Sequence, residues 1–409
     1  MEDIKMKFKP SIFNIEFEYS DKKYIYNTKS TTLALLEKSF NEAVKNENIL
    51  TSLVECGFAV EEGYNEVEEL ERMVQNEINE NDKSLELTII LTEACNFRCV
   101  YCYQKRDKKI FSKNDVDRLF KNLEVLFKDG LEELKIHYFG GEPLLNLEVL
   151  REIDKGIKSL CKKYNIKFSS FITTNGSLLT VEIINELQFT TIQLTFDGDI
   201  NTHHKYKISD NYGYNDLLVL IDNIFKYTKS KLRIRFNICK ENEKFFEDVI
   251  DDVMSLKTIC HKRFIFAFNP MRNYNNGNKF TELTAFEYGK IELRLKKYLI
   301  SKGLILSMPK ALLQPCKFVS GKALCLGPNL QSYFCTSSSI EIESNIKNYL
   351  HNNQKNYVFP EVCRSCKVLP MCINACHVLV PGENACIAEK YNLVDQLKCY
   401  LNQPEMWKE

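Results

Sequence analysis

The feature that most constrains the fold is a strand-then-helix pattern that repeats six times after residue 84. Six consecutive strand-helix units imply parallel strands joined by right-handed crossovers. We therefore predict an α/β fold containing a partial (β/α)6 TIM-type barrel, in which ligands lie at the carboxyl ends of the strands. The expected strands are residues 85–91, 134–139, 167–173, 191–196, 232–238 and 263–268, and the expected helices between them are residues 112–130, 147–164, 181–187, 214–228 and 244–256.

Polar and glycine-rich motifs follow these strands, as a site on one rim of the barrel requires. Paired glycines after the second strand let the backbone approach a ligand, and the glutamate behind them can bind an ammonium group. The polar turn after the third strand can meet hydroxyl groups. The expected rim residues are Gly140, Gly141, Glu142, Asn175, Thr195, His203, His204 and Lys207.

Three cysteines follow the first strand directly. Cys95, Cys99 and Cys102 have the spacing C-x3-C-x2-C, so one short loop can wrap a single metal centre. A structural zinc ion needs four ligands. A four-iron cluster takes one thiolate at each iron, and three thiolates leave one iron open to bind another molecule. The spacing favours the cluster, and a zinc loop is the alternative.

At these residues the sequence resembles the radical S-adenosylmethionine (radical SAM) superfamily, with Tyr101 as the aromatic residue of its cysteine signature. The resemblance implies a [4Fe-4S] cluster that binds S-adenosyl-L-methionine through the open iron. Reductive cleavage would give methionine and a 5'-deoxyadenosyl radical that abstracts hydrogen from the substrate. It also implies a low-potential electron donor of the flavodoxin or ferredoxin type.

The same resemblance suggests roles for the rim residues. Gly140, Gly141 and Glu142 match the segment that binds the methionine amino group, and Thr195 stands where many members have a serine that contacts the cofactor. Lys207 stands where the matched subfamily has an arginine, and lysine keeps the charge without the two-pronged grip on a carboxylate. We read His204 and His137 as ordinary rim or core histidines.

A second set of thiols lies near the carboxyl end and resembles the SPASM domain of peptide- and protein-modifying radical SAM enzymes. Eight thiols suffice for two auxiliary [4Fe-4S] clusters without an open iron. Two zinc ribbons are the alternative, because zinc also accepts four thiolates. By the resemblance, the inner cluster would take Cys316, Cys325, Cys335 and Cys376, and the outer one Cys363, Cys366, Cys372 and Cys386.

Two details of this region stay open. Cys399 is a spare thiol, either packed in the final helix or replacing Cys386 as the last ligand. Leu330 stands where the family usually has glycine, a departure from the family at the local turn.

The first 83 residues are expected to form a small α+β module. Residues 11–20 and the segment from Tyr24 predict a hairpin, residues 31–44 an amphipathic helix, residues 49–58 a second segment, and residues 61–81 a charged helix or linker. The module resembles the leader-peptide-binding part of peptide-modifying members, and a cap on the barrel is the alternative. The expected domains are residues 1–83, the barrel at 84–305, and the SPASM domain at 306–409.

Composition bears on partners and location. Lys plus Arg and Asp plus Glu both number 55, so no net field favours nucleic acid or a membrane surface. No apolar run reaches membrane-spanning length, and the start is not a signal peptide. We therefore expect a cytoplasmic protein, in which 16 cysteines indicate metal ligands rather than disulfides.

The function favoured by these patterns is oxidative modification of a ribosomally made precursor peptide or protein, forming a thioether or another side-chain crosslink. Formylglycine formation, as in sulfatase maturases, is the alternative. Related maturases carry an aspartate after the cysteine matching Cys335, where this chain has Thr336, a poor base. A non-enzymatic alternative is an iron-sulfur electron carrier or a zinc-ribbon interaction protein.

Overall fold

The computed structural model describes residues 7–80, 83–104, 107–273, 280–337, 341–342, 357–373 and 386–403. The chain forms two compact units. Unit 1 comprises Met1–Glu80, Thr284–Val319 and Gln354–Glu409, and unit 2 comprises Asn81–Leu283 and Ser320–Asn353. The change of unit at residue 80 lies close to the predicted boundary at residue 83. The other changes of unit follow residues 283, 319 and 353, so the segment after residue 305 is shared between the units.

Unit 2 is built on a sheet with the strand order β13-β12-β10-β9-β8-β6-β14-β15-β16. All pairings from β13 to β14 are parallel, and the pairings of β15 are antiparallel. The α/β fold predicted from the sequence is confirmed. The strands are β6 (Ser84–Ile90), β8 (Glu133–Phe139), β9 (Lys167–Thr173), β10 (Thr191–Phe196), β12 (Lys231–Ile238), β13 (Phe264–Pro270), β14 (Ala323–Leu326), β15 (Ser332–Tyr333) and β16 (Glu341–Ile342).

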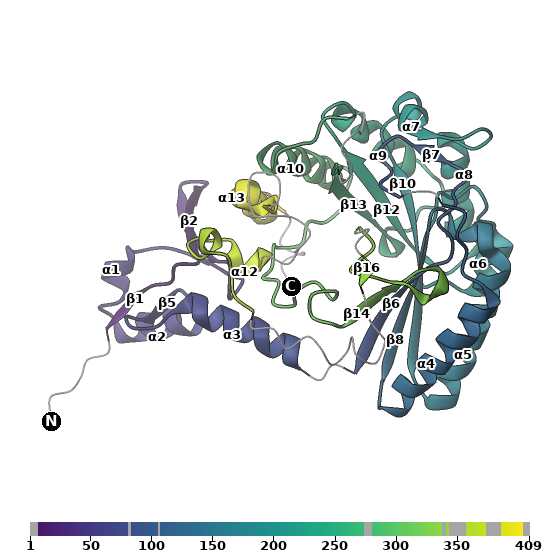
Figure 1. The fold of residues 1–409 in the computed structure, drawn as a ribbon. Helices are drawn as coiled ribbons and strands as arrows, with labels where there is room; N and C mark the ends of the chain where they lie inside the picture. Colours follow the sequence, from purple (N-terminus) through teal and green to yellow (C-terminus); the bar gives the residue numbers. More distant parts are fainter. Residues whose placement is uncertain are drawn as a thin grey trace. The chain divides into compact units, whose positions relative to one another are not determined.

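Helices follow the parallel strands as expected and lie on one side of the sheet in Figure 1. Ser112 caps the first of them, where its side chain accepts from Asp115 N and Asp115 bonds back to the Ser112 backbone. The helices of unit 2 are α4 (Lys113–Lys128), α5 (Leu147–Tyr164), α6 (Val181–Leu187), α7 (Ile200–Tyr206), α8 (Tyr214–Tyr227) and α9 (Phe246–Met254), with 3-10 turns at Pro143–Asn146, Glu243–Phe245, His261–Arg263 and Pro328–Leu330.

The two faces of the sheet differ in character, because successive side chains of a strand point to opposite faces. One face is buried and apolar, as shown by Leu85, Leu87 and Ile89 of β6 and by Leu232 and Ile234 of β12. We call the opposite face the inner face. It carries a row of polar side chains in register across the strands: Thr88, His137, Thr173, Gln193, Thr195, Arg233 and Arg235.

Unit 1 contains two small sheets from the amino-terminal segment. One has the order β2-β3-β4, and the other pairs β1 with β5. The predicted hairpin is present, with its turn at Ser20–Asp21. The strands are β1 (Phe8–Pro10), β2 (Asn14–Tyr19), β3 (Lys22–Asn27), β4 (Thr32–Leu35) and β5 (Ala59–Glu61), and the helices are α1 (Phe40–Ala43), α2 (Glu47–Glu55), α3 (Glu66–Asn79), α10 (Ala285–Ser301), α12 (Leu369–Cys372) and α13 (Glu389–Leu401), with a 3-10 turn at Glu361–Cys363.

The amphipathic helix predicted for residues 31–44 was wrong. Thr32–Leu35 form strand β4 instead, and only Phe40–Ala43 are helical. The strand pairs with β3, with Tyr24 opposite Leu35 and Asn27 opposite Thr32. Backbone groups at the edge of β3 need partners, and this requirement outweighs a short apolar periodicity that fits both structures.

The charged segment before the first parallel strand is a helix rather than a linker. Helix α3 begins after Asn65, whose side chain accepts from Val67 N and Glu68 N. Val67, Leu70 and Val74 are buried in one cluster with residues from the carboxyl-terminal segment, including Phe359 and Leu369. The apolar stripe of α3 therefore joins both ends of the sequence within unit 1.

In the described part of the chain, no helix is both long enough and apolar enough to span a membrane.

Candidate active site

The loop with Cys95, Cys99 and Cys102 leaves the carboxyl end of β6, as predicted. The thiols lie close enough for each of Cys95 and Cys102 to affect the pKa of Cys99. Burial raises the pKa of Cys99 to about 12 and also raises that of Cys95. Since a metal binds the thiolate, loading this loop must release protons.

Two short strands hold the middle of this loop. β7 (Arg98–Cys99) pairs antiparallel with β11 (Lys207–Ile208), and Lys207 stands opposite Cys99. In addition, Val100 N donates to Tyr206 O at 3.0 Å. The segment after α7 thus lies along the cysteine loop, although more than 100 residues separate them.

Gly140 and Gly141 let the cysteine loop approach the end of β8. A Cβ atom at Gly140 would lie 2.5 Å from Thr92 O, and one at Gly141 would lie 2.2 Å from Ala94 O. Gly141 N donates to Thr92 O, and Glu142 N donates to Ala94 O. We predicted that these glycines let the backbone approach a ligand. In the structure they let it approach the cysteine loop instead.

Glu142 is fully buried and surrounded by donors. Its carboxylate accepts from Thr174 Oγ1 at 2.7 Å, Asn175 N at 2.8 Å and Leu144 N at 3.2 Å. Burial raises its pKa, while these hydrogen bonds and Lys207 oppose the rise. The side chain joins the ends of β8 and β9, a role that sequence reasoning missed.

Asn175 connects the turn after β9 to the cysteine loop. Its Nδ2 donates to Asn96 Oδ1 at 2.8 Å and lies 4.0 Å from Cys95 Sγ. Its Oδ1 accepts from Ser177 Oγ at 2.6 Å. An amide donor beside a ligating sulfur stabilises the thiolate form.

Lys207 brings a buried cation to this loop. Its side chain is 5% exposed, and Nζ donates to Thr195 O at 3.1 Å and lies 6.0 Å from the centre of the Phe97 ring. Its charge lowers the pKa values of Cys99, Glu142 and Asp197. Lys207 and Thr195, two predicted cofactor residues, are therefore in direct contact.

Tyr101 contacts a buried carboxylate that sequence reasoning left without a role. Its hydroxyl donates to Asp197 Oδ2 at 2.9 Å, and the other oxygen, Oδ1, is buried without a partner. Asp197 is 0% exposed, and burial raises its pKa. The only sequence signal was its place in the Thr-Phe-Asp-Gly motif after β10.

The three histidines that the sequence analysis singled out lie in different surroundings. His203 is buried, and its Nδ1 accepts from Asp197 N at 3.4 Å. His204 is exposed and its Nε2 accepts from Tyr214 N. His137 lies on the inner face between Thr88 and Thr173, and burial lowers its pKa to about 3, so it is neutral at pH 7. The ordinary readings of His137 and His204 fit these contacts.

The three thiols of the cysteine loop lie within electrostatic reach of one another. No three side chains of metal-binding type converge closely enough to hold a single ion among the described residues. Cys95, Cys99 and Cys102 nevertheless interact electrostatically on one loop. A four-iron cube takes each thiolate at its own iron, so the sulfurs need not converge on one point.

The carboxyl-terminal thiols divide between the two units. In unit 2, Cys325 of β14 and Cys335 are near enough that Cys335 raises the pKa of buried Cys325. Cys316 belongs to unit 1. Cys376 lies outside the described residues.

The thiols predicted for the outer cluster come together within unit 1. Cys366 and Cys386 both affect the pKa of Cys363, and Cys363 and Cys372 both affect that of Tyr357. By contrast, the charged groups that affect Cys399 are Lys297 and Asp395. Cys386, rather than Cys399, therefore accompanies Cys363.

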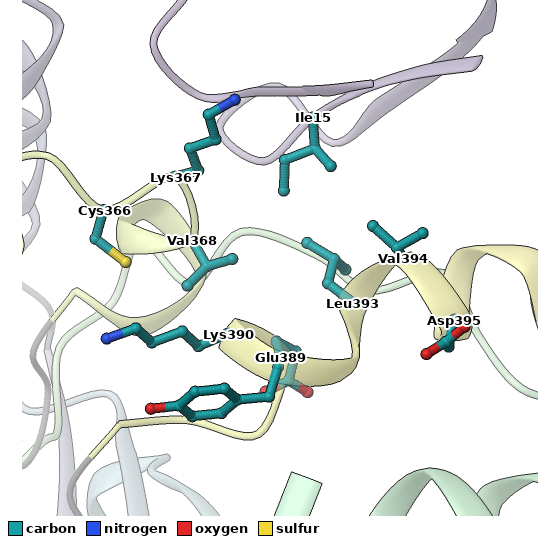
Figure 2. A pocket seen from close by; sticks show the side chains of 10 residues that line it. Ile15, Cys366, Lys367, Val368, Glu389, Lys390, Leu393, Val394 and Asp395 are labelled. Atoms are coloured by element: carbon teal, nitrogen blue, oxygen red, sulfur yellow. The ribbon is translucent and has the colours of Figure 1, made fainter. Parts of the chain in front are cut away.

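A cation lies beside this second set. Lys390 of α13 donates to Cys386 Sγ at 3.5 Å, and Cys366 also raises the pKa of Lys390. Figure 2 shows Lys390 and Cys366 along one pocket of about 370 Å³, whose apolar side chains include Val368 and Leu393.

The turn between Cys325 and Cys335 keeps a glycine-like conformation without glycine. Asn329 and Leu330 have φ angles of 62° and 57°, in the left-handed region. Asn329 N donates to Asp115 Oδ2, and Arg118 Nη1 donates to Asn329 O, so the turn is fixed at the start of α4. Leu330 thus adopts the conformation that the family's glycine would favour.

Comparison with known proteins places this geometry in a family. Residues 89–253 match the model of the Radical SAM superfamily. The radical SAM cyclopropyl synthase TigE of Paramaledivibacter caminithermalis is 22% identical over 402 residues, which cover 86% of this chain and 81% of TigE. The GTP 3',8-cyclase of Clostridium botulinum is 29% identical over 298 residues, covering 66% of this chain and 85% of the cyclase.

Solved structures share the fold. The structure of anSMEcpe with bound AdoMet has a TM-score of 0.59 at 16% identity and covers 79% of this chain and 97% of its own. Streptococcus suis SuiB bound to the precursor peptide SuiA has a TM-score of 0.53 at 15% identity and covers 91% of this chain and 96% of its own. Residues 89–253 of this chain are therefore a radical SAM domain, and this family implies a [4Fe-4S] cluster and S-adenosylmethionine.

Proposed function

We propose that this enzyme oxidatively modifies a ribosomally made peptide, forming a thioether or another side-chain crosslink. The observation that carries the proposal is the second set of thiols, in which Cys363 interacts electrostatically with Cys366 and Cys386. A chain that only cleaved S-adenosylmethionine would need the first thiol loop alone. Forming a crosslink from two side chains removes two hydrogens, and further metal centres suit such an oxidation.

The barrel rim would bind the cofactors. Cys95, Cys99 and Cys102 would hold the first cluster, which together with S-adenosylmethionine supplies a 5'-deoxyadenosyl radical when bound. Lys207 would face the carboxylate of the methionine moiety. Its Nζ already donates to Thr195 O, so the two residues would act at one place. The remaining cofactor-binding residues in the proposal are Tyr101, Gly140, Gly141, Glu142 and Asn175.

The carboxyl-terminal thiols would hold two auxiliary [4Fe-4S] clusters in a SPASM domain. The outer one would take Cys363, Cys366, Cys372 and Cys386, and the inner one Cys316, Cys325, Cys335 and Cys376. The effects of Cys366 and Cys386 on Cys363 support the outer group, and the effect of Cys335 on Cys325 supports that pair of the inner group. Zinc at these positions is the competing assignment.

A peptide substrate is supported by the relatives' own partners. SuiB has been solved with a precursor peptide, and anSMEcpe with bound AdoMet and the Cp18Cys peptide. In this chain, the leader of such a peptide would add to the amino-terminal sheet. Strands β2 and β4 stand at its two edges, and an extended peptide can pair with an exposed strand edge.

Formylglycine formation has less support. Thr336 follows Cys335, and the Thr336 backbone oxygen accepts from Tyr103 Oη at 2.5 Å. Threonine cannot act as the proton acceptor that an aspartate would be, because its hydroxyl remains protonated at neutral pH.

The test is mass spectrometry of small cysteine-rich peptides that are co-expressed with this chain, with a Cys99→Ala variant as the control. We expect a loss of two hydrogens per modification, with the two linked residues remaining joined on fragmentation. A mass change that corresponds to conversion of a cysteine to an aldehyde would indicate formylglycine formation instead. The control condition supplies a flavodoxin- or ferredoxin-type donor and shows that the reduced protein still cleaves S-adenosylmethionine. If the peptides remain unchanged under that condition, a peptide substrate is contradicted.

A further inference from the structure

Two arginines of β12 lie on the inner face of the sheet. Along this strand Leu232, Ile234 and Phe236 are buried on the apolar face, so Arg233 and Arg235 point to the inner one. Arg233 stands opposite Gln193 of β10, and Arg235 stands opposite Thr195. Arg235 therefore lies beside the rim residue Thr195, and Arg233 lies one step further from the rim on the same face.

The described residues give the two arginines few hydrogen-bonding or ionic partners. Arg235 Nε donates to the neutral side chain of Asn237 at 2.8 Å. Arg233 Nε is buried and has no hydrogen-bond partner. Within the described part of the chain, neither arginine forms an ion pair, although Asp197 is near enough for Arg235 to lower its pKa. A buried donor without a partner is costly, and a bound acceptor would remove that cost.

The surrounding polar groups do not supply the missing charge. His137 Nε2 and Gln193 Nε2 both contact Thr173 Oγ1, at 2.9 and 3.3 Å. Burial and the charge of Arg233 keep His137 neutral at pH 7, because they lower its pKa to about 3. Burial and Arg235 also lower the pKa of Arg233, as expected for two neighbouring cations. Within the described residues, Arg233 thus has no ion-pair partner on this part of the inner face, whereas Arg235 has the carboxylate of Asp197 nearby.

We propose that Arg233 and Arg235 bind a carboxylate of the substrate peptide and so select an acidic residue, or the peptide's carboxyl terminus, near the reacting position. This inference rests on the proposed peptide-modifying function. Planar guanidinium groups grip carboxylates in a bidentate way, which fixes the orientation of the bound group as well as its charge.

The position of Arg233 favours the substrate over the cofactor. Thr195, a predicted cofactor contact, is in register with Arg235, whereas Arg233 stands two residues earlier in the strand. Two residues of a strand span about 6.6 Å. Arg233 is therefore deeper in the sheet than the rim, where Lys207 is available for the cofactor's own carboxylate.

The experiment uses the full-length, cluster-loaded protein with S-adenosylmethionine and three peptide probes. The probes are acetyl-Gly-Glu-Gly-amide, acetyl-Gly-Gln-Gly-amide, and acetyl-Gly-Gly-Gly with a free carboxyl terminus. Their affinities are measured by saturation-transfer NMR. We expect one of the two carboxylate probes to bind about 10-fold more tightly than the neutral glutamine peptide, and the preferred probe identifies the source of the carboxylate.

Three variants test the residues. Arg233→Gln should abolish the preference, and Arg233→Lys should retain a smaller one, because lysine keeps the charge but loses the fork. Lys231→Gln removes an exposed cation two residues earlier on the same strand and should change nothing. Iron content and thermal unfolding show whether each variant is folded. If Arg233→Gln does not fold, the peptide preference of Arg233→Lys tests the role of the arginine.

The outcomes separate this inference from the proposed function. Equal binding of all three probes to the wild-type protein would overturn the carboxylate site. A lower affinity of Arg233→Gln for S-adenosylmethionine, with the peptide preference unchanged, would assign the arginine to the cofactor and also overturn it. Failure of the wild-type protein to modify any peptide would count against the proposed function alone, since probe binding is measured without turnover.

Discussion

The two described thiol sets are held in different ways. Cys95, Cys99 and Cys102 lie on a loop at the end of a parallel strand, and the backbone pairing of β7 with β11 fixes its middle. The close approach of Gly141 and the buried carboxylate of Glu142 fix its base. Rigid secondary structure thus surrounds the first set.

The second set depends on short turns and on segments distant in sequence. Cys363 ends a 3-10 turn, and Cys366 N donates to Cys363 O. Cys386 stands before α13, and Lys390 of that helix contacts it. We therefore expect the first set to be organised by the sheet before a metal binds, and the second set to depend more on the clusters that we propose for it.

The largest difference is expected for removal of one thiol from each set. Cys99→Ala should abolish formation of 5'-deoxyadenosine, because the first cluster loses one of its three ligands. Cys366→Ala should spare this reaction and abolish modification of the peptide. The measurements are chromatography of the nucleoside and mass spectrometry of the peptide, with Cys399→Ala as an unaffected control. Equal effects of the first two variants would contradict the division between the sets.

A backbone change should affect the first set almost as strongly. Gly141→Ala would place a Cβ atom 2.2 Å from Ala94 O, and backbone atoms cannot move aside easily. We expect a loss of about 2 kcal/mol in the free energy of unfolding and a lower iron content after reconstitution. Gly63→Ala is the matched control, since a Cβ there meets nothing within 4 Å. An unchanged iron content in Gly141→Ala would contradict the view that the close approach of Gly141 fixes the base of the cysteine loop.

The sheet under the first set should be sensitive to acid. The pKa of His137 is about 3 in the folded protein and 6.5 in the reference state, so the unfolded chain binds the extra proton first. Stability due to neutral His137 is therefore present above pH 6.5 and lost as the pH falls toward 3, by up to about 1.4 kcal/mol per pH unit.

Chemical unfolding of His137→Gln at several pH values measures this contribution. The wild-type protein should lose more stability than the variant between pH 7 and pH 5. The exposed His204 provides a comparison variant, His204→Gln, with the same substitution away from the inner face. Parallel curves for all three proteins would mean that the inner face is already open to solvent protons.

The second set should respond to its neighbouring cation. Lys390→Met removes the donor to Cys386 Sγ, and loss of a positive charge and a hydrogen bond makes a cluster harder to reduce. We expect the reduction potential of the proposed outer cluster to fall by roughly 60 mV, a tenfold change in the one-electron equilibrium. Potentiometric titration followed by EPR measures it, with Lys367→Met as a control from the same pocket. No shift would mean that Lys390 does not act on that cluster.

The smallest effect is expected in the turn between Cys325 and Cys335. Leu330 has a φ angle of 57°, which a leucine adopts at a cost of about 1 kcal/mol. Leu330→Gly should therefore raise the free energy of unfolding by up to about 1 kcal/mol, measured by chemical denaturation. Leu330→Ala, which keeps the Cβ atom, should give no such gain. Destabilisation by glycine would show that packing of the leucine side chain outweighs its backbone strain.

Local sequence rules predicted the sheet unit well. Strands β9 and β10 and helices α5 and α6 have the bounds expected from periodicity, caps and turn residues. These elements bury one continuous apolar side, so the pattern in the sequence reports the packing directly. The segment at residues 31–44 failed because its structure depends on pairing with β3, a contact that no local pattern reveals.

The site was predicted in its residues but not in all its contacts. The order of the rim motifs along parallel strands brought Gly140, Glu142, Asn175 and Thr195 to one edge. The chain's own donors bind the Glu142 carboxylate, and Asp197 lies beside Tyr101. Both contacts depend on side-chain packing, which the spacing of residues in the sequence does not show. Sequence reasoning assigned Arg233 no role, although it lies in a predicted strand. Only the register of β12 with its neighbours shows that its side chain lies on the inner face.

The central claim is that three thiols hold a cluster with one open iron, at which S-adenosylmethionine is cleaved. The direct measurement is incubation of anaerobically purified, reconstituted and reduced wild-type protein with S-adenosylmethionine, followed by quantification of 5'-deoxyadenosine. The account predicts this product from wild-type protein and none from Cys99→Ala. A wild-type protein that retains its first cluster and forms no 5'-deoxyadenosine, or that contains only zinc at this loop, would contradict it.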